Sequence, residues 1–482
     1  MSKYETIIGL EIHCQLATES KMFCSCSTKF GSKPNTNICP ICTGQPGVLP
    51  KINKKAIELA IKTALALNCK IEPNSVFARK NYFYPDLPKA YQISQYELPL
   101  ATNGYLMIEV GGKKNKIGIT RVHLEEDAGK LVHQGAERIM GSDYSLVDYN
   151  RGGTPLMEIV SEPDIRSPQE AKAYMETLAH LLHYIGVSDA KMEEGSLRCD
   201  ANISIRPFGQ NEFGTKTELK NINSFRYVLK GLEAEEARHR EMVGSGEKII
   251  QETRYFDTNT EDTKNMRSKE SAHDYRYFPD PDLVDCRPDQ AWIDKIKASM
   301  TELPEARKAR YIKDYGLSDQ AAETLTATSD ISDYFEACLK VRKMPKEIAN
   351  WILGDITAYA KNNNFNYAEL QLKPNQLIEM IKMIENGTIS GKIAKEIVVK
   401  ALDSGNPIEK IVKASGQTQI SNEEELTGIV KQVIEKNPKQ VEQFKSGKDS
   451  VIMFLVGQVM KATKGRAKPD LVQKLLRKEL IS

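Results

Sequence analysis

The sequence predicts an α+β protein, in which a mixed α/β domain with a mostly antiparallel sheet precedes a helical domain and a small helical tail domain. In residues 1–293, short segments with the strand period of two lie among Gly- and Pro-rich turns. After residue 294, apolar residues recur at helical spacing and the strand pattern fades. Because the strands do not alternate regularly with helices, a doubly wound sheet is disfavoured.

The elements are expected in this order. In the first domain, apolar residues follow the helical period over 54–67, 168–185 and 226–243, with strand-like runs between them, as at 105–110 and 199–206. The second domain, 294–405, opens with a helix-start pattern and is expected to be a helical linking domain. A third, helical domain is expected over 406–482.

Length and composition limit the class of protein. A chain of 482 residues is too long for one ordinary core, so two or three domains are expected. No run approaches the roughly 18–20 apolar residues of a membrane span, and the N-terminus lacks a signal-peptide core, so a cytoplasmic location is expected. The net charge of +2 excludes nucleic-acid binding through a global positive field, which leaves only local patches.

Five segments of the first domain place acidic residues or histidine at alternate positions between apolar neighbours, at 9–13, 121–127, 155–160, 199–205 and 217–221. In a strand, residues i and i+2 point to the same side of the sheet, so the pairs that share a face are Glu11 with His13, His123 with Glu125, and Asp200 with Asn202. A solvated sheet face would explain the alternation. The repeated choice of Glu, Asp and His favours instead a site for a hard divalent cation.

Four of the nine cysteines form two close pairs, Cys24 with Cys26 and Cys39 with Cys42. The odd total and the uneven placement argue against a disulfide framework. Two close pairs joined by a short loop let four thiolates meet one Zn²⁺ tetrahedrally, so we expect a zinc knuckle at 24–42, with a redox pair as the alternative. Four thiolates leave no open position for water, which indicates a structural role.

Several segments carry clustered positive charge. The loop at 79–95 combines cations, rings and prolines, as loops that hold charged side chains against phosphate do. Two glycines at 152–153 let backbone N–H groups approach an anion, although the lysine and helix entry of a P-loop are missing. Residues 431–482 contain twelve Lys or Arg and only five Asp or Glu. Either a solvated helix face or a nucleic-acid contact explains this basic patch.

Taken together, the motifs resemble those of one family, the B subunits of the tRNA-dependent amidotransferase, which converts Glu-tRNA(Gln) and, in many organisms, Asp-tRNA(Asn) to the amides. The resemblance covers nearly the full length, and its motifs lie at 9–16, 39–47, 79–95, 123–129, 148–158, 200–204, 217–225, 267–283 and 454–465. One departure is Ala90, where glycine is common in the family.

The resemblance implies that the first domain is a synthetase or kinase cradle. ATP would phosphorylate the side-chain carboxylate of the misacylated residue, because ammonia attacks a free carboxylate too poorly, and Mg²⁺ would screen the nucleotide's charge. The implied magnesium ligands and catalytic residues are Glu11, His13, Glu125, Glu126, Asp200 and Glu218, with Glu158 as a ligand or a residue that supports one. The implied phosphate or substrate contacts are Arg79, Lys80, Lys89 and Arg151, with simple salt bridges as the competing explanation.

The chain shows no glutaminase signature, so ammonia must come from a partner. The family uses an amidase-type glutaminase as its A subunit, together with a small C subunit, and a tunnel joins the active sites. The resemblance implies the same heterotrimer here. Lys89 and Tyr91 are expected near the tunnel mouth. The residues expected to bind the misacylated tRNA are the basic tail residues Lys461, Lys464, Arg466 and Lys468.

Two other functions use part of these motifs. A zinc-containing tRNA-binding or chaperone protein without catalysis would use the cysteines and the basic tail, but it would not hydrolyse ATP in response to misacylated tRNA. A stand-alone ATP-dependent carboxylate–amine ligase would use free ammonia and need no tRNA. Neither explains the whole set of motifs. Whether Glu-tRNA(Gln), Asp-tRNA(Asn) or both are substrates depends on which synthetases the organism carries.

Overall fold

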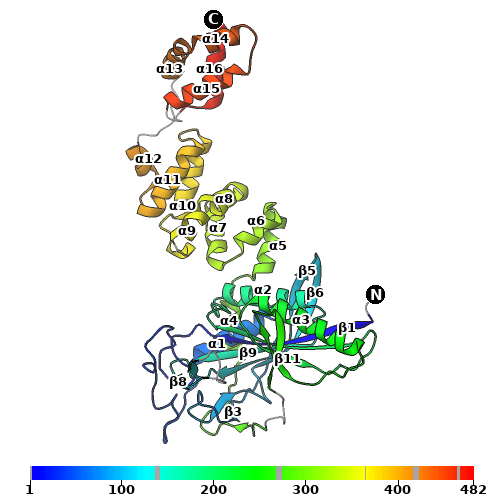
Figure 1. The fold of residues 1–482 in the computed structure, drawn as a ribbon. Coiled ribbons are helices and arrows are strands. Elements are labelled where there is room, and N and C mark those ends of the chain that lie inside the picture. The colour runs from blue at the N-terminus through cyan, green and yellow to red at the C-terminus, as the bar shows by residue number, and fades with distance from the viewer. Residues whose placement is uncertain are drawn as a thin grey trace. The chain divides into compact units, whose positions relative to one another are not determined.

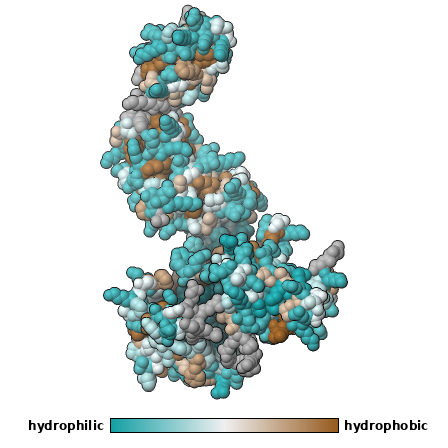
Figure 2. Space-filling view, viewed as in Figure 1, coloured by the Kyte–Doolittle hydropathy of each residue, from teal (hydrophilic) through white to brown (hydrophobic). Residues whose placement is uncertain are grey.

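The structure is a computed structural model that describes residues 3–135, 142–267, 274–363, 365–415, 423–463 and 467–481 (Figure 1). The chain divides into two compact units, Met1–Leu303 and Pro304–Ser482. None of the helices in the described ranges is both long and apolar enough to cross a membrane. The face seen in Figure 2 is mostly hydrophilic, with apolar residues scattered among polar ones.

The first unit is built on a sheet with nine strands among its described residues, in the order β13-β12-β11-β10-β1-β9-β6-β5-β2. Only β11 and β12 run parallel, so the predicted mostly antiparallel sheet is confirmed. Its strands are β1 (Tyr4–Gln15), β2 (Lys70–Ile71), β5 (Ala101–Val110), β6 (Lys113–Glu126), β9 (Pro155–Ser161), β10 (Leu197–Pro207), β11 (Thr217–Ile222), β12 (Thr253–Asp257) and β13 (Asp262–Arg267). Among the described residues, β3 (Ala78–Asn81), β4 (Tyr91–Ser94) and β14 (Phe278–Pro279) form one smaller sheet. Another smaller sheet contains β7 (Lys130–Gln134) and β8 (Tyr144–Asp148).

Strand β1 explains why the large sheet has one apolar and one polar face. Ile8, Leu10 and Ile12 alternate along it and are almost fully buried, whereas Glu11 and His13 point to the opposite side. The apolar residues share one core with three helices that pack against the sheet (Figure 1), which are α1 (Lys54–Ala66), α2 (Pro168–Tyr184) and α3 (Phe225–Gly244). These helices cover the apolar face of the sheet, so a site that uses Glu11 and His13 must lie on the opposite, polar face.

The second unit is helical throughout its described residues, as the sequence predicts. Its helices are α5 (Pro304–Tyr315), α6 (Asp319–Leu325), α7 (Ser329–Val341), α8 (Pro345–Trp351), α9 (Thr357–Asn363), α10 (Pro374–Glu385), α11 (Gly391–Ser404), α12 (Ile408–Ser415), α13 (Glu423–Lys436), α14 (Pro438–Lys445), α15 (Val451–Ala462) and α16 (Pro469–Ile481). A π-helical turn, η1 (Ile352–Ile356), joins α8 to α9, and a short 3₁₀ turn, η2 (Tyr367–Glu369), precedes α10.

Two separate apolar cores stabilise the second unit. The first extends from Tyr311 to Val412 and therefore includes α12, and the second extends from Leu426 to Leu480. Helix α4 (Gln290–Ala298) contributes Ile296 to the core of the first unit instead. The division into domains at 1–293, 294–405 and 406–482 stays a prediction.

Candidate functional site

Three strands bring a histidine and two glutamates together on the polar face of the sheet. His13 on β1, Glu125 on β6 and Glu158 on β9 each offer a ligand atom, and these atoms lie within 4.8 Å of one another. His13 Nε2 is 3.3 Å from Glu158 Oε2 and 3.7 Å from Glu125 Oε1. The strand register explains the convergence, since Glu158 is the pairing partner of His13 on one side and of His123 on the other.

Glu11 and Asp200 extend this group into an acidic row. They are pairing partners on β1 and β10, so their side chains leave the sheet on the same side. The Glu11 carboxylate is half-buried, and no described residue donates it a hydrogen bond or lies within ion-pair distance. Burial and the charges of Glu158 and Asp200 raise the pKa of Glu11. The nearby Lys220 and His13 lower the pKa of Glu11, but they do not outweigh burial and the acidic neighbours.

Cations of the chain itself balance other members of the row. Lys220 Nζ lies 2.6 Å from Asp200 Oδ2 and 3.3 Å from Glu218 Oε1. Arg121 Nη2 lies 3.5 Å from Glu158 Oε1. Burial lowers the pKa of His13, but its hydrogen bond to Glu158 and the surrounding carboxylates outweigh burial and raise that pKa to about 9. A metal ion bound to His13 must therefore displace a proton at neutral pH.

The donor set fits a hard divalent cation. Carboxylate oxygens from two strands and one imidazole nitrogen from a third lie within 4.8 Å of one another. Mg²⁺ is commonly held by one or two protein carboxylates together with water and substrate phosphates. Of the predicted magnesium ligands, the structure brings Glu11, His13, Glu125 and Asp200 together, with Glu158 at the centre. Their role as ligands stays a prediction.

Glu126 does not join the acidic row, because consecutive residues of a strand point to opposite sides. Its carboxylate accepts a hydrogen bond from Ile93 N at 3.0 Å and forms an ion pair with Lys89. Both side chains are buried, with 8% of Lys89 and 4% of Glu126 exposed. They line a cavity that is also lined by Phe23, Cys42, Tyr91 and Gly153.

The other predicted phosphate contacts already have partners in the chain. Arg79 donates to Asp280 Oδ2 at 2.9 Å and to Asp282 Oδ2 at 3.0 Å. Arg151 donates to the backbone carbonyls of residues 128 and 129. Lys80 lies over aromatic rings, its Nζ 4.9 Å from the centre of the Tyr275 ring. Salt bridges, the competing explanation, account for the position of Arg79.

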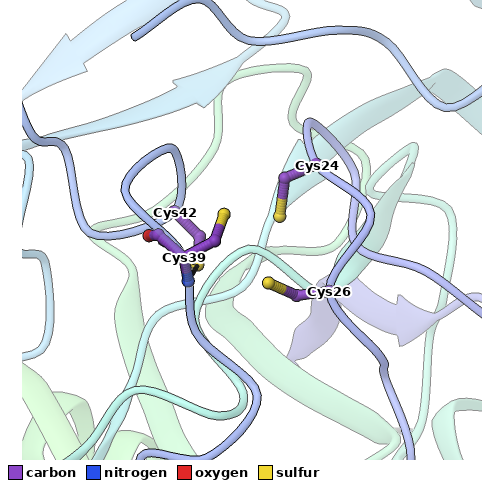
Figure 3. A group of neighbouring side chains, drawn as sticks. All are labelled: Cys24, Cys26, Cys39 and Cys42. Carbon is purple, nitrogen blue, oxygen red and sulfur yellow. Dashed lines mark hydrogen bonds between the residues drawn. The ribbon is translucent and has the colours of Figure 1, made fainter.

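The four cysteines of the predicted zinc knuckle form a second candidate metal site (Figure 3). Their Sγ atoms lie within 4.8 Å of one another, and none is in a disulfide. A tetrahedral site with Zn–S bonds of about 2.3 Å needs sulfur atoms about 3.8 Å apart, so the group fits zinc. A hydrogen bond from Cys24, the N–H of Cys39 and the nearby Lys21 ammonium outweigh burial and lower the pKa of Cys42 to about 4.

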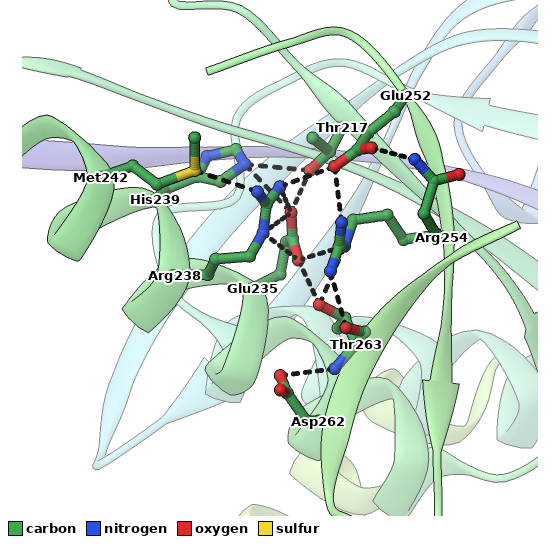
Figure 4. Close-up of polar contacts among 10 residues, drawn as sticks. Thr217, Glu235, Arg238, His239, Met242, Glu252, Arg254, Asp262 and Thr263 are labelled. Atoms are coloured by element: carbon green, nitrogen blue, oxygen red, sulfur yellow. Dashed lines mark hydrogen bonds and ion pairs between the residues drawn. The ribbon is translucent and has the colours of Figure 1, made fainter. Parts of the chain in front are cut away.

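A buried polar network on the apolar side of the sheet holds β11, β12 and β13 against α3 (Figure 4). The fully buried Glu235 accepts hydrogen bonds from Thr217 Oγ1 at 2.8 Å and Thr263 Oγ1 at 2.7 Å. It also pairs with Arg238 and with Arg254. Since Thr217 precedes Glu218, this network fixes the strand whose other face contributes to the acidic row.

The network predicts an acid-dependent loss of stability. Burial raises the pKa of Glu235, but hydrogen bonds from His239, Arg238 and two threonines outweigh burial and hold that pKa well below its usual range. A lowered pKa contributes stability above the unfolded value of about 4.3, and this contribution is lost as the pH falls below it. Glu235→Gln should therefore cost about 3 kcal/mol at pH 7 and progressively less below pH 4.3.

Thermal unfolding of the full chain between pH 7 and pH 3.5 measures this difference. Glu109→Gln, at an exposed position of β5, is the matched control and should match the wild type throughout. A gap between wild type and Glu235→Gln that stays constant with pH would contradict the assignment.

The sequence prediction placed His123 on the same face as Glu125 but did not name it as a ligand, and it assigned no role to Arg121 or Lys220. The alternation along each strand could have identified two of them. His123 lies two residues before Glu125, and Lys220 lies two residues after Glu218, so each shares a strand face with a predicted ligand. In the tail, Lys461 and Lys468 are exposed, whereas Lys464 and Arg466 lie outside the described residues. Ala90 has a φ of 63°, in the left-handed region that favours glycine.

Comparisons with known proteins agree with this geometry. Residues 6–294 match the family model described as the GatB/GatE catalytic domain, and residues 333–480 match the GatB domain. The chain is 55% identical over 478 residues to the B subunit of aspartyl/glutamyl-tRNA(Asn/Gln) amidotransferase from Thermodesulfovibrio yellowstonii, covering 99% of each chain. It is 53% identical over 480 residues to the protein of the same name from Carboxydothermus hydrogenoformans, covering 100% of this chain and 99% of the other. It is 54% identical over 482 residues to that from Brevibacillus brevis, covering 100% of both.

Proposed function

The chain belongs to the family of aspartyl/glutamyl-tRNA(Asn/Gln) amidotransferase B subunits, and from this premise we propose that it activates and amidates a misacylated residue on tRNA. The side-chain carboxylate of Glu on tRNA(Gln), of Asp on tRNA(Asn), or of both, takes a phosphoryl group from ATP. Ammonia then displaces phosphate from the acyl phosphate to give the amide. The convergence of His13, Glu125 and Glu158 on one sheet face is the observation that supports this most.

The acidic row supplies the groups that phosphoryl transfer needs. Bound Mg²⁺ would screen the phosphate charge and orient the terminal phosphoryl group. His13, Glu125 and Glu158 would hold the ion, with Glu11 and Asp200 beside it. Lys220, fixed between Asp200 and Glu218, keeps a positive charge next to the row. We assign Glu126 to the support of Lys89 and the four cysteines to a structural zinc.

Ammonia would reach the row through the cavity lined by Lys89 and Glu126. Its source would be an amidase-type glutaminase, the A subunit, which the small C subunit holds in place. Glu126, which lines the cavity, is the last residue of β6 and points to the side opposite Glu125, so ammonia would pass around the end of this strand to reach the row. The heterotrimer would act on tRNA in the cytoplasm.

Lys89→Met is expected to lower glutamine-dependent amidation at least tenfold and to leave ammonium-supported amidation nearly unchanged, because ammonium at high concentration can enter from solvent. The variant also leaves the buried Glu126 carboxylate without its partner, which can cost several kcal/mol of stability. The double variant Lys89→Met/Glu126→Gln removes both charges and separates the two effects. Equal loss of both activities in the double variant would contradict a role in ammonia passage.

The basic tail is proposed to bind tRNA through its backbone phosphates. Truncation after Ser415 keeps α12, which belongs to the apolar core that extends from Tyr311 to Val412. It removes the apolar core that extends from Leu426 to Leu480, together with Lys461 and Lys468. The truncated heterotrimer should bind tRNA at least tenfold more weakly and with a shallower dependence on salt, while its metal binding is unchanged. Filter binding over a salt series measures this, and normal tRNA affinity would show that the patch is only a solvated surface.

One experiment tests the function as a whole. The chain is purified with its A and C partners and assayed on both misacylated tRNAs with glutamine and ATP, with amide and ADP measured together. One ADP per amide formed is the expected result. No ATP hydrolysis in response to misacylated tRNA would favour a non-catalytic tRNA-binding protein. Amidation of free glutamate would favour a stand-alone ligase.

A further inference from the structure

Lys21 is a lysine whose side chain is fully buried beside the zinc knuckle. Its Nζ donates to the backbone carbonyl of Tyr149 at 3.1 Å and lies 3.6 Å from Cys42 Sγ. Among the described residues, no carboxylate lies within ion-pair distance of this ammonium. Because a buried charge is costly without a partner of opposite charge, the Cys42 thiolate is the anion that suits Lys21.

Lys21 shares a small cavity with the ion pair of Lys89 and Glu126. The cavity has a volume of about 70 Å³, and its lining includes these three side chains together with Cys42. A Cβ built on Gly153 would lie 3.3 Å from Lys21 Cδ and 3.8 Å from Glu126 Oε2, so both side chains flank this glycine. Two buried cations and two anionic groups therefore meet around one space.

The zinc knuckle also contacts Lys89 directly. Gly44 lies two residues after Cys42, and a Cβ built on it would be 2.6 Å from Lys89 Cγ and 3.1 Å from Lys89 Cα. The stem of Lys89 therefore packs against the turn that carries Cys42, while its ammonium pairs with Glu126. A change of charge at the knuckle acts at short range on Lys89.

The charge of the zinc site makes this arrangement sensitive to Lys21. A zinc ion held by four thiolates leaves two negative charges, and Lys21 offsets one of them. Attraction between charges is strong where water is excluded. Lys89 is the only other cation among the described residues that line the cavity. Without Lys21, the thiolates would draw Lys89 away from Glu126.

We propose that Lys21 is a positioning residue, which supports the zinc-bound thiolate of Cys42 and thereby keeps Lys89 paired with Glu126. Each buried cation then has its own anion. The part of this proposal that concerns Lys89 rests on the proposed function, in which the cavity carries ammonia. Lys21 itself touches no substrate and acts through its two neighbours, so the zinc knuckle and the passage of ammonia are coupled.

Lys21→Met keeps an unbranched side chain and removes the charge. The heterotrimer that carries it should lose zinc to a chromophoric chelator at least about tenfold more readily, because substitution of the residues that support metal ligands costs 10- to 100-fold in affinity. Lys62→Met is the matched control. Lys62 also donates to a backbone carbonyl, that of Ile185, but it lies outside the lining of the cavity, so this variant should hold zinc as the wild type does.

The second measurement is amidation with zinc in the buffer, so that the knuckle stays loaded. Glutamine-dependent amidation by Lys21→Met should fall at least about fivefold, with ammonium-supported amidation nearly unchanged. Because Lys21 acts through Lys89, adding Lys21→Met to Lys89→Met should cause no further fall. A role in folding alone would lower both activities alike, and its effect would multiply with that of Lys89→Met.

Unchanged zinc affinity in Lys21→Met would overturn the proposal, and so would losses that multiply in the double variant. If Lys21→Met does not fold, Lys21→Gln takes its place in both measurements, because glutamine keeps a donor for the Tyr149 carbonyl and lacks the charge. A wild-type heterotrimer without glutamine-dependent amidation would end the proposed function and the role at Lys89 with it. The zinc competition would then decide by itself whether Lys21 supports Cys42.

Discussion

Glu125→Gln is expected to lower the rate of amidation at least about a hundredfold while the activity of the partner glutaminase is retained. The substitution keeps the shape of the side chain and removes one of the two carboxylates that lie close to His13. Substitutions in the supporting residues around metal sites already cost about 10- to 100-fold in metal affinity or activity, and this one removes a proposed ligand.

Two measurements make this result specific. The Mn²⁺ affinity of Glu125→Gln should fall together with its amidation rate, and higher divalent metal concentrations should restore part of the rate. Glu109→Gln makes the same chemical change at an exposed position of the same sheet and should behave as the wild type. A Glu125→Gln heterotrimer with normal amidation would show that the acidic row does not serve catalysis.

Cys42→Ser is expected to lose zinc and to lower the melting temperature of the chain by at least about 5 °C. Structural zinc sites contribute binding free energy directly to folding, about 10–16 kcal/mol in zinc-finger peptides. A loss of a few kcal/mol of this in a unit of this size shifts the melting temperature by several degrees. The knuckle also packs beside the Lys89 cavity, so its loss should lower glutamine-dependent amidation.

Elemental analysis and thermal unfolding test this prediction together. Cys286→Ala removes a buried thiol that lies outside the four-cysteine group, so it should keep one zinc per chain. Addition of a strong chelator to the wild type should reproduce the Cys42→Ser melting temperature. Full zinc content in Cys42→Ser, or a chelator that removes zinc without any change in melting, would contradict a structural zinc.

Much of the local structure can be predicted from the sequence because local signals decide it. The helices α1, α2 and α3 begin and end within about one residue of the predicted bounds, since Asn53, Ser167 and Ser224 cap their first turns. Alternation along β1 correctly places Glu11 and His13 on one face. The four cysteines could be grouped from spacing alone, because a short loop brings the two pairs together.

Contacts between distant segments could not be predicted in the same way. Glu158 lies at the centre of the acidic row because β9 is inserted between β1 and β6, and strand order is decided by tertiary packing. The ion pairs of Arg79 with Asp280 and Asp282 join residues about two hundred positions apart. Glu126 is a different case: the alternation rule itself sets it on the side opposite Glu125, because the strand continues through both residues.

The most direct test of the account is to locate the divalent metal ion in crystals of the heterotrimer grown with Mn²⁺. An anomalous difference map should show manganese bonded to His13, Glu125 and Glu158, with Glu11 and Asp200 within reach of its waters. A map in which manganese lies elsewhere, while the three side chains keep only their contacts with one another, would contradict the central claim.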